Sequence, residues 1–192
     1  MDRTMISHAG KAIIVFLLFA LSSCAAHMTQ EVGSNLRPSV MSAVYQDRAT
    51  DLRHPSRCPS TPSVSIINAE LRDIDYQVRE LPGKRWYINP KELAGYIVPY
   101  MREAYGQCRV VNDPTSTKVI RLSIQNVVTK IHWLSGAQIT VKIEIPELQL
   151  ERLFSTEEWT IHGMSQALAY AIHLTTWEVI RDSEIQDYIL CR

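Results

Sequence analysis

The chain lacks most of the short motifs that mark catalytic and metal-binding proteins. It contains no His-Glu-x-x-His, no Cys-x-x-Cys, and no two histidines four residues apart, as a helical zinc site requires. Gly-x-Ser-x-Gly and Gly-x-x-x-x-Gly-Lys are absent too, which argues against a common serine hydrolase and against a phosphate-binding loop. We therefore expect a protein that is not an enzyme and that needs neither a metal ion nor a cofactor.

Paired carboxylates for acid–base catalysis are missing as well. Glu157 and Glu158 are adjacent, but they fall in a predicted strand, where successive side chains point to opposite faces. His132, His162 and His173 are the histidines of the predicted folded domain. We expect each of them to be a strand or surface residue rather than a ligand.

An excess of one charge is also lacking. The 20 lysines and arginines balance 20 aspartates and glutamates, so the formal net charge is zero. Nothing in this balance indicates a nucleic acid or another polyanion as the partner.

The chain has one long apolar run, residues 12–21, which follows the basic residues Arg3 and Lys11. As a helix it would span about 15 Å, half of a hydrocarbon core of roughly 30 Å. This length favours a secretory signal over a transmembrane helix. Met5 could be the start as well as Met1, since Lys11 alone would supply a charged lead.

The apolar run ends in Leu21, Ser22, Ser23 and Cys24, a sequence that resembles the bacterial lipobox. The resemblance implies cleavage before Cys24, diacylglycerol on its thiol, and acylation of the new amino group, so that labelled palmitate would enter the protein. Ala25, in place of Asp, favours the outer membrane, with the protein facing the periplasm. The alternative is a secreted soluble protein that is cleaved near Ala25 or Ala26.

Composition divides the chain into three parts. Residues 1–23 are the predicted signal peptide, and residues 24–62 are predicted to be the lipidated cysteine and a flexible tether. The tether contains Pro38, Pro55, Pro59 and Pro62 and little apolar periodicity. Residues 63–192 are long enough for one domain with a sizeable core.

Apolar spacing predicts the elements of this domain. A strand begins near residue 63 and extends to about Leu71, and a helix follows with Asn89 as its cap and Gly106 at its end. Residues 118–145 alternate as an antiparallel hairpin with a turn at Ser135 and Gly136 and a β-bulge near residues 125–126. A bend at Pro146, another strand, a helix from residue 164 and a short helix from residue 183 complete the chain. The predicted fold is α+β, with a mainly antiparallel sheet of four to five strands and two main helices on one face.

The order of lipobox, tether, strand, helix, strands and helix, with Asp182 and Ile185 near a short terminal helix, resembles the small YajG-type envelope lipoproteins. It is similar also to the auxiliary lipoproteins of ABC-type lipid-transport systems. The extra cysteines and the proline-rich tether depart from both. The resemblance implies a non-enzymatic accessory subunit that contacts the membrane through its lipid and binds envelope proteins or an amphiphile between helices and sheet. The alternative is a structural subunit of a secretion, pilus or flagellar assembly, and a hydrolase comes third.

Two further features have alternative interpretations. Trp133, beside the hairpin turn, is either a core or cross-strand aromatic or an exposed contact for a partner or for lipid. Cys58 precedes the first strand, and Cys108 follows the first helix. A helix that packs back on its sheet returns the chain to the end at which the strand starts, so we predict a disulfide between Cys58 and Cys108. If residues 109–111 are not a strand, Cys191 becomes a competing partner.

Overall fold

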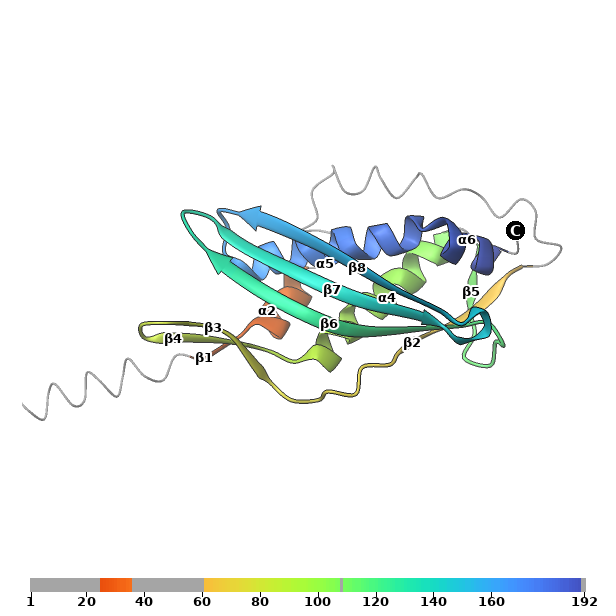
Figure 1. The fold of residues 1–192 in the computed structure, drawn as a ribbon, viewed down its shortest axis with the longest axis horizontal. Coiled ribbons are helices and arrows are strands. Elements are labelled where there is room, and N and C mark those ends of the chain that lie inside the picture. Colours follow the sequence, from red (N-terminus) through yellow and green to blue (C-terminus); the bar gives the residue numbers. More distant parts are fainter. Residues whose placement is uncertain (1–24, 36–60, 108, 191–192) are drawn as a thin grey trace, which may run out of the picture.

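A five-stranded sheet forms the centre of the computed structural model, which describes residues 25–35, 61–107 and 109–190 (Figure 1). The order of the strands is β5-β2-β6-β7-β8. The strands are β2 (Ser63–Asn68), β5 (Val111–Asn112), β6 (Val119–Ile131), β7 (Ser135–Ile145) and β8 (Leu150–Thr160). β6, β7 and β8 are antiparallel, whereas β2 is parallel to both of its neighbours.

Helices α4 (Pro90–Gln107) and α5 (Met164–Arg181) cover one face of this sheet, and α6 (Ser183–Leu190) follows α5 (Figure 1). The predicted α+β class and the two helices on one face are confirmed. Asn89 caps α4 as predicted, because its Oδ1 accepts hydrogen bonds from the main-chain N–H groups of Lys91 at 3.0 Å and Glu92 at 3.2 Å. No helix in the described part of the chain is both long enough and apolar enough to cross a membrane.

The hairpin of β6 and β7 has the predicted face and the predicted bulge. Every second residue of each strand points into the core: Ile120, Leu122, Ile124, Ile139, Val141, Ile143 and Ile145. The register shifts between Ile124 and Asn126, so Val127 and Ile131 also pack against the core beyond the bulge. The turn is not where we predicted it, because Ser135 and Gly136 already pair with β6 and the connection is residues 132–134.

A second, smaller sheet has the order β1-β4-β3, with β1 (Ala25–His27), β3 (Tyr76–Leu81) and β4 (Lys84–Ile88). β1 pairs in parallel with β4, from Ala25 opposite Arg85 to His27 opposite Tyr87. The following helix α2 (Met28–Asn35) fully buries Met28 and Val32 and packs on α4 and α5.

Residues 25–35 therefore belong to the folded structure, although their sequence predicted a tether. They carry too few apolar residues to signal a helix on their own, and it is burial against other elements that defines α2. Residues 36–60, the remainder of the predicted tether, lie outside the described residues.

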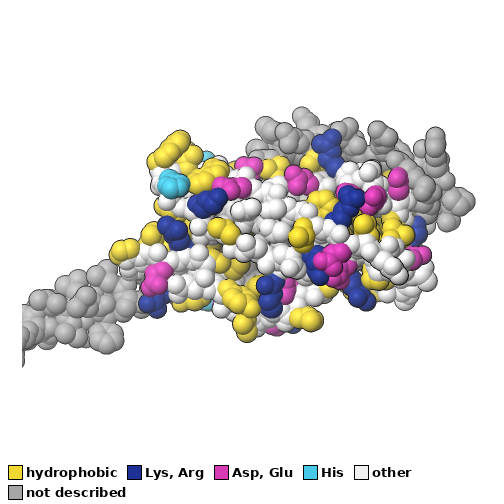
Figure 2. Space-filling view, viewed as in Figure 1, with side chains coloured by type: hydrophobic (Ala, Val, Ile, Leu, Met, Phe, Trp, Pro, Cys, Tyr) yellow, Lys and Arg dark blue, Asp and Glu magenta, His cyan; other side chains and the backbone are white. Residues whose placement is uncertain are grey.

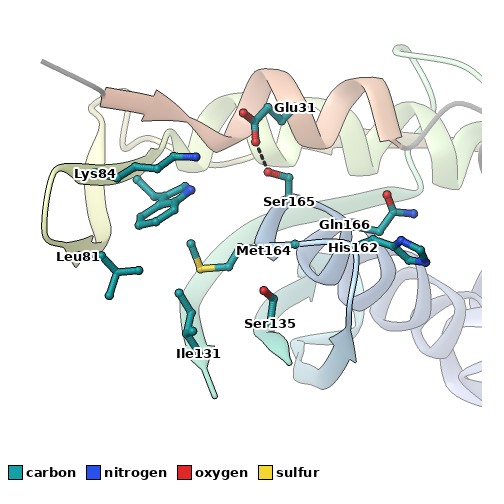
Figure 3. A pocket seen from close by; sticks show the side chains of 11 residues that line it. Glu31, Leu81, Lys84, Ile131, Ser135, His162, Met164, Ser165 and Gln166 are labelled. Carbon is teal, nitrogen blue, oxygen red and sulfur yellow. Dashed lines mark hydrogen bonds between the residues drawn. The ribbon is translucent and has the colours of Figure 1, made fainter. Parts of the chain in front are cut away.

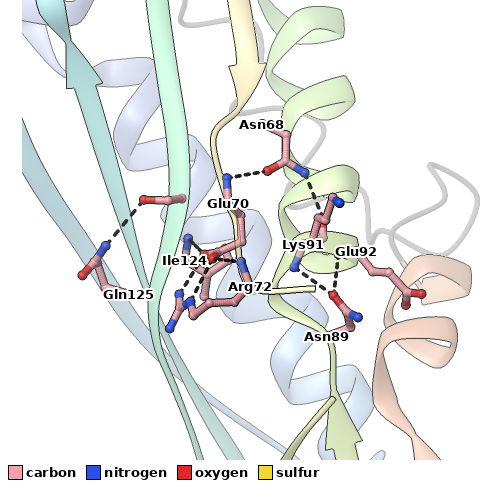
Figure 4. Close-up of polar contacts among 9 residues, drawn as sticks. Asn68, Glu70, Arg72, Asn89, Lys91, Glu92, Ile124 and Gln125 are labelled. Carbon is pink, nitrogen blue, oxygen red and sulfur yellow. Dashed lines mark hydrogen bonds and ion pairs between the residues drawn. The ribbon is translucent and has the colours of Figure 1, made fainter. Parts of the chain in front are cut away.

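β2 ends at Asn68, three residues earlier than predicted, and the side chain of Glu70 takes over its pairing with β6 (Figure 4). The Glu70 carboxylate accepts the main-chain N–H of Ile124 at 2.9 Å, next to the bulge. It also accepts hydrogen bonds from Nε and Nη2 of Arg72, at 2.8 and 2.7 Å. Burial raises the pKa of Glu70, but the hydrogen bonds from Arg72 and Ile124 outweigh it and hold that pKa below its usual value.

The molecule has two distinct ends along its long axis (Figure 1). The β1 end consists of β1, the β3–β4 turn at residues 82–83, the β6–β7 turn at residues 132–134, and residues 161–163. The β5 end consists of β5, the start of β2 and the end of α6, where Tyr188 Oη accepts the main-chain N–H of Val119 at 3.0 Å.

Candidate binding site at the β1 end

A pocket of about 570 Å³ opens at the β1 end of the molecule (Figure 3). Four segments that are distant in sequence form its wall: α2, the β3–β4 hairpin, the adjoining ends of β6 and β7, and the start of α5. Its apolar lining is Leu81, Trp86, Ile131 and Met164. Its polar lining is Glu31, Lys84, Ser135, His162, Ser165 and Gln166.

Polar and apolar groups lie side by side in the pocket (Figure 3). Ser165 donates a hydrogen bond to the carboxylate of Glu31, which joins the start of α5 to α2. Met164, Ile131 and Leu81 lie below this contact in the view of Figure 3. Lys84 extends over Trp86, with its Nζ 4.9 Å from the ring centroid. The pocket thus combines an apolar surface with a cation, a carboxylate and neutral hydrogen-bonding groups.

The three histidines of residues 63–192 have different environments. His132 stacks on Trp159 with ring centroids 5.8 Å apart, and His162 is exposed at the pocket. His173 is buried between α5 and α4, where its Nδ1 is 2.7 Å from the hydroxyl of Tyr100. Burial raises the pKa of Tyr100 to about 12, so this hydroxyl stays protonated at neutral pH. Among the described residues, no group of three His, Cys, Asp or Glu side chains could hold a metal ion.

Trp133 lies at the surface, and its contact with a partner or with lipid stays a prediction. Its side chain is 87% exposed in the β6–β7 turn, so it is not a core aromatic. The cross-strand aromatic is Trp159, which lies opposite Gly136 in the register of β7 and β8. A Cβ on Gly136 would lie 2.7 Å from the Trp159 ring, so this ring covers the glycine.

Sequence reasoning missed the pocket. Its residues come from segments about 130 positions apart, and no motif joins Glu31 with Lys84 or Ser165. The sequence held one local signal, the glycine directly before α5. Gly163 has a φ of 103°, a backbone conformation that residues other than glycine rarely adopt.

The predicted lipidation site Cys24 and the cysteines Cys58, Cys108 and Cys191 lie outside the described residues. Pro62 and Val111, which follow Cys58 and Cys108 by a few positions, meet at the β5 end, where Val111 N–H donates to the carbonyl of Pro62 at 2.9 Å. α6 ends here too, because β5 is only two residues long and does not carry the chain to the other end. The disulfide between Cys58 and Cys108 stays a prediction, with Cys191 as the competitor that a short β5 allows.

No family model matches the chain, and no curated protein matches it. Among solved structures, the chain is similar to a Xanthomonas campestris protein described as DUF330, with a TM-score of 0.43 and 16% identity, over 70% of this chain and 90% of that one. A second similar structure, described as an uncharacterized protein, has a TM-score of 0.36 and 14% identity, over 62% of this chain and 88% of that one. Neither description names an activity.

Proposed function

We propose that the protein is a non-enzymatic lipoprotein of the outer membrane, facing the periplasm, that binds an amphiphile as the accessory subunit of a membrane-associated complex. The amphiphile would be a lipid or another envelope component in transport. One observation carries the proposal: the pocket of mixed polarity lies at the end of the molecule where β1 begins, directly after Cys24.

The lining of the pocket suits a molecule with an apolar chain and a polar head. Leu81, Trp86, Ile131 and Met164 offer apolar surface, and Lys84 offers a cation. The volume of about 570 Å³ falls within the range of roughly 300–1,000 Å³ that is usual for small-molecule sites.

The position of β1 brings this pocket close to the proposed lipid anchor. Ala25 is already paired with Arg85, so no free linker separates Cys24 from the fold. One extended residue spans about 3.3 Å, which would hold the β1 end at the headgroups of the anchoring leaflet. An amphiphile could then pass between the bilayer and the pocket over a short path.

Lipid analysis of the protein extracted from membranes tests this function. We expect an amphiphile to co-purify, and we expect Leu81→Asp to remove it, because that change puts a charge into the apolar wall. Leu148→Asp is the matched control, since Leu148 is 51% exposed in the β7–β8 connection and is not part of the pocket. Protein that carries no amphiphile, or that loses it equally in both variants, would contradict the proposal.

A structural subunit of a secretion, pilus or flagellar assembly is the second candidate. β8 favours it, because this eleven-residue strand lies at the edge of the five-stranded sheet. Charges along that strand, at Glu151, Arg152, Glu157 and Glu158, discourage pairing with another chain, and for this reason the candidate comes second. A stable complex whose assembly depends on β8 would favour this candidate over the first.

A further inference from the structure

Three apolar side chains are exposed together at the β1 end. Trp133 is 87% exposed, Ile161 is 77% exposed and Trp159 is 37% exposed. Ser135 pairs with both Ile131 and Thr160, so the turn that carries Trp133 lies beside the turn that carries Ile161. We call Trp133, Trp159 and Ile161 the apolar tip. Figure 2 shows a group of hydrophobic side chains next to a histidine at this end of the molecule.

The base of the apolar tip is held by several contacts. The Trp159 ring lies over Gly136 and stacks on His132. Lys130 is 6.0 Å from the centroid of Trp159 and forms an ion pair with Glu157 at 2.7 Å. Trp133 and Ile161 thus project from an ordered base, while their own apolar surface faces water, which is unfavourable unless another surface covers it.

The apolar tip lies at the same end of the molecule as the first residue of β1 (Figure 1). The pocket joins the two regions, because Ile131 and Ser135, which flank the tip, line it together with Trp86. Trp86 in turn pairs with Ala26. A lipid on Cys24 would therefore bring the bilayer to the side of the molecule on which Trp133 and Ile161 are exposed.

We infer that Trp133 and Ile161 enter the interfacial layer of the leaflet that holds the Cys24 acyl chains, an inference that rests on the proposed function. Tryptophan suits this layer because its large ring is apolar and its N–H remains able to reach water or headgroups. Lys84, His132 and His162 are exposed at the same end and suit contact with headgroups. The anchor makes the contact intramolecular, so a weak affinity of the tip for lipid suffices.

A bilayer fits the apolar tip better than a protein partner does, because the anchor itself would bring it there. The two contacts together fix how the domain stands on the membrane. The anchor alone would leave the domain free to tilt, whereas the anchor and tip together hold the mouth of the pocket at the bilayer surface.

Quenching of tryptophan fluorescence by brominated lipids tests the inference on the full lipidated protein. The vesicles are phosphatidylethanolamine with phosphatidylglycerol, with and without bromine on the acyl chains. We expect bromine to quench the wild-type emission, more strongly from shallow than from deep positions, and Trp133→Phe to lose most of this quenching. The matched control is Trp133→Phe combined with Leu148→Trp, which keeps four tryptophans but moves one to the β7–β8 connection, and which should lack the quenching.

The outcomes separate the two proposals. Protein that does not float with vesicles at all would overturn the lipid anchor and this inference with it. Protein that floats, but whose quenching is unchanged by Trp133→Phe or is restored by Leu148→Trp, would overturn the inference alone. A Trp133 that is shielded from iodide in water without being quenched by bromine would show that a second copy or another protein covers the tip, and this too would overturn the inference.

Discussion

The side chain of Glu70 takes the place of a strand residue in the pairing between β2 and β6. Its carboxylate is almost fully buried and replaces a main-chain partner for Ile124 at the point where β6 bulges. Arg72 binds the same carboxylate with a two-pronged contact that neutralises the charge. The network holds the end of β2 against the middle of the long hairpin.

Glu70→Gln should therefore destabilise the protein at neutral pH by about 1–3 kcal/mol, because it weakens charge-assisted hydrogen bonds to a buried group. The pKa of Glu70 is lower in the folded state than its ordinary value of 4.5. Its stabilising effect is thus fully present above pH 4.5 and is lost as the pH falls through the folded pKa. Urea unfolding from pH 7 to pH 3 should show the two proteins converging in acid. Glu80→Gln, at an exposed carboxylate that pairs with Arg85, should change little at any pH, and equal losses in both variants would contradict this account.

Gly33 lets α2 approach α4 closely. A Cβ at this position would lie 2.5 Å from Cζ of Tyr96, so Gly33→Ala must displace the ring or the helix. We expect the cost of about 1–3 kcal/mol to exceed the roughly 0.5–1 kcal/mol that alanine gains over glycine within a helix. We expect faster hydrogen exchange in residues 25–35 and a lower Tm. Gly95→Ala is the control within α4, where an added Cβ meets nothing within 4 Å and alanine favours the helix. If both substitutions raise the Tm alike, α2 does not pack as described.

The β6–β7 hairpin is the element on which the core depends most. The inward side chains of β7 pack against α5, and those of β6 pack against α4. The outward side chains of β7 are polar and partly exposed. Because successive side chains of a strand point to opposite faces, substitutions at two neighbouring residues probe opposite faces of the sheet.

Val141→Asp should cost several kcal/mol, since Val141 is 1% exposed and the new charge would have no partner in the core. Thr140→Asp should be mild, because Thr140 lies on the outer face, where its hydroxyl shares a hydrogen bond with that of Ser155 at 2.9 Å. Thermal unfolding of both variants measures the difference. Equal shifts would mean that the register or the face is wrong.

Local patterns were sufficient for the elements that have local causes. Alternation predicted β6 and β7, the change of parity near Gln125 predicted the bulge, and Asn89 followed by Pro90 predicted the start of α4. Elements with long-range causes were missed or misjudged. β1 and α2 exist because other segments bury them, and β2 stops early because a side chain two residues beyond it replaces its ladder. The pocket could not be predicted for the same reason, since tertiary packing alone brings its four segments together.

The whole molecule is arranged around its β1 end. The pocket, the apolar tip and the first residue of β1 all lie there, while β5, the start of β2 and the end of α6 lie at the opposite end (Figure 1). This polarity is what a domain standing on a membrane surface needs, with its binding site toward the lipid. Both proposals depend on the residue that precedes β1.

Incorporation of radiolabelled palmitate is the most direct test of that dependence. The account predicts that the wild-type protein is labelled and sediments with the outer membrane, and that Cys24→Ser is unlabelled and is released from it or mislocalised. Cys24→Ser leaves β1 and the pocket untouched, so the variant should fold as the wild type does. Palmitate that still enters the Cys24→Ser protein would contradict the lipid anchor, and with it the claim that the β1 end faces the bilayer.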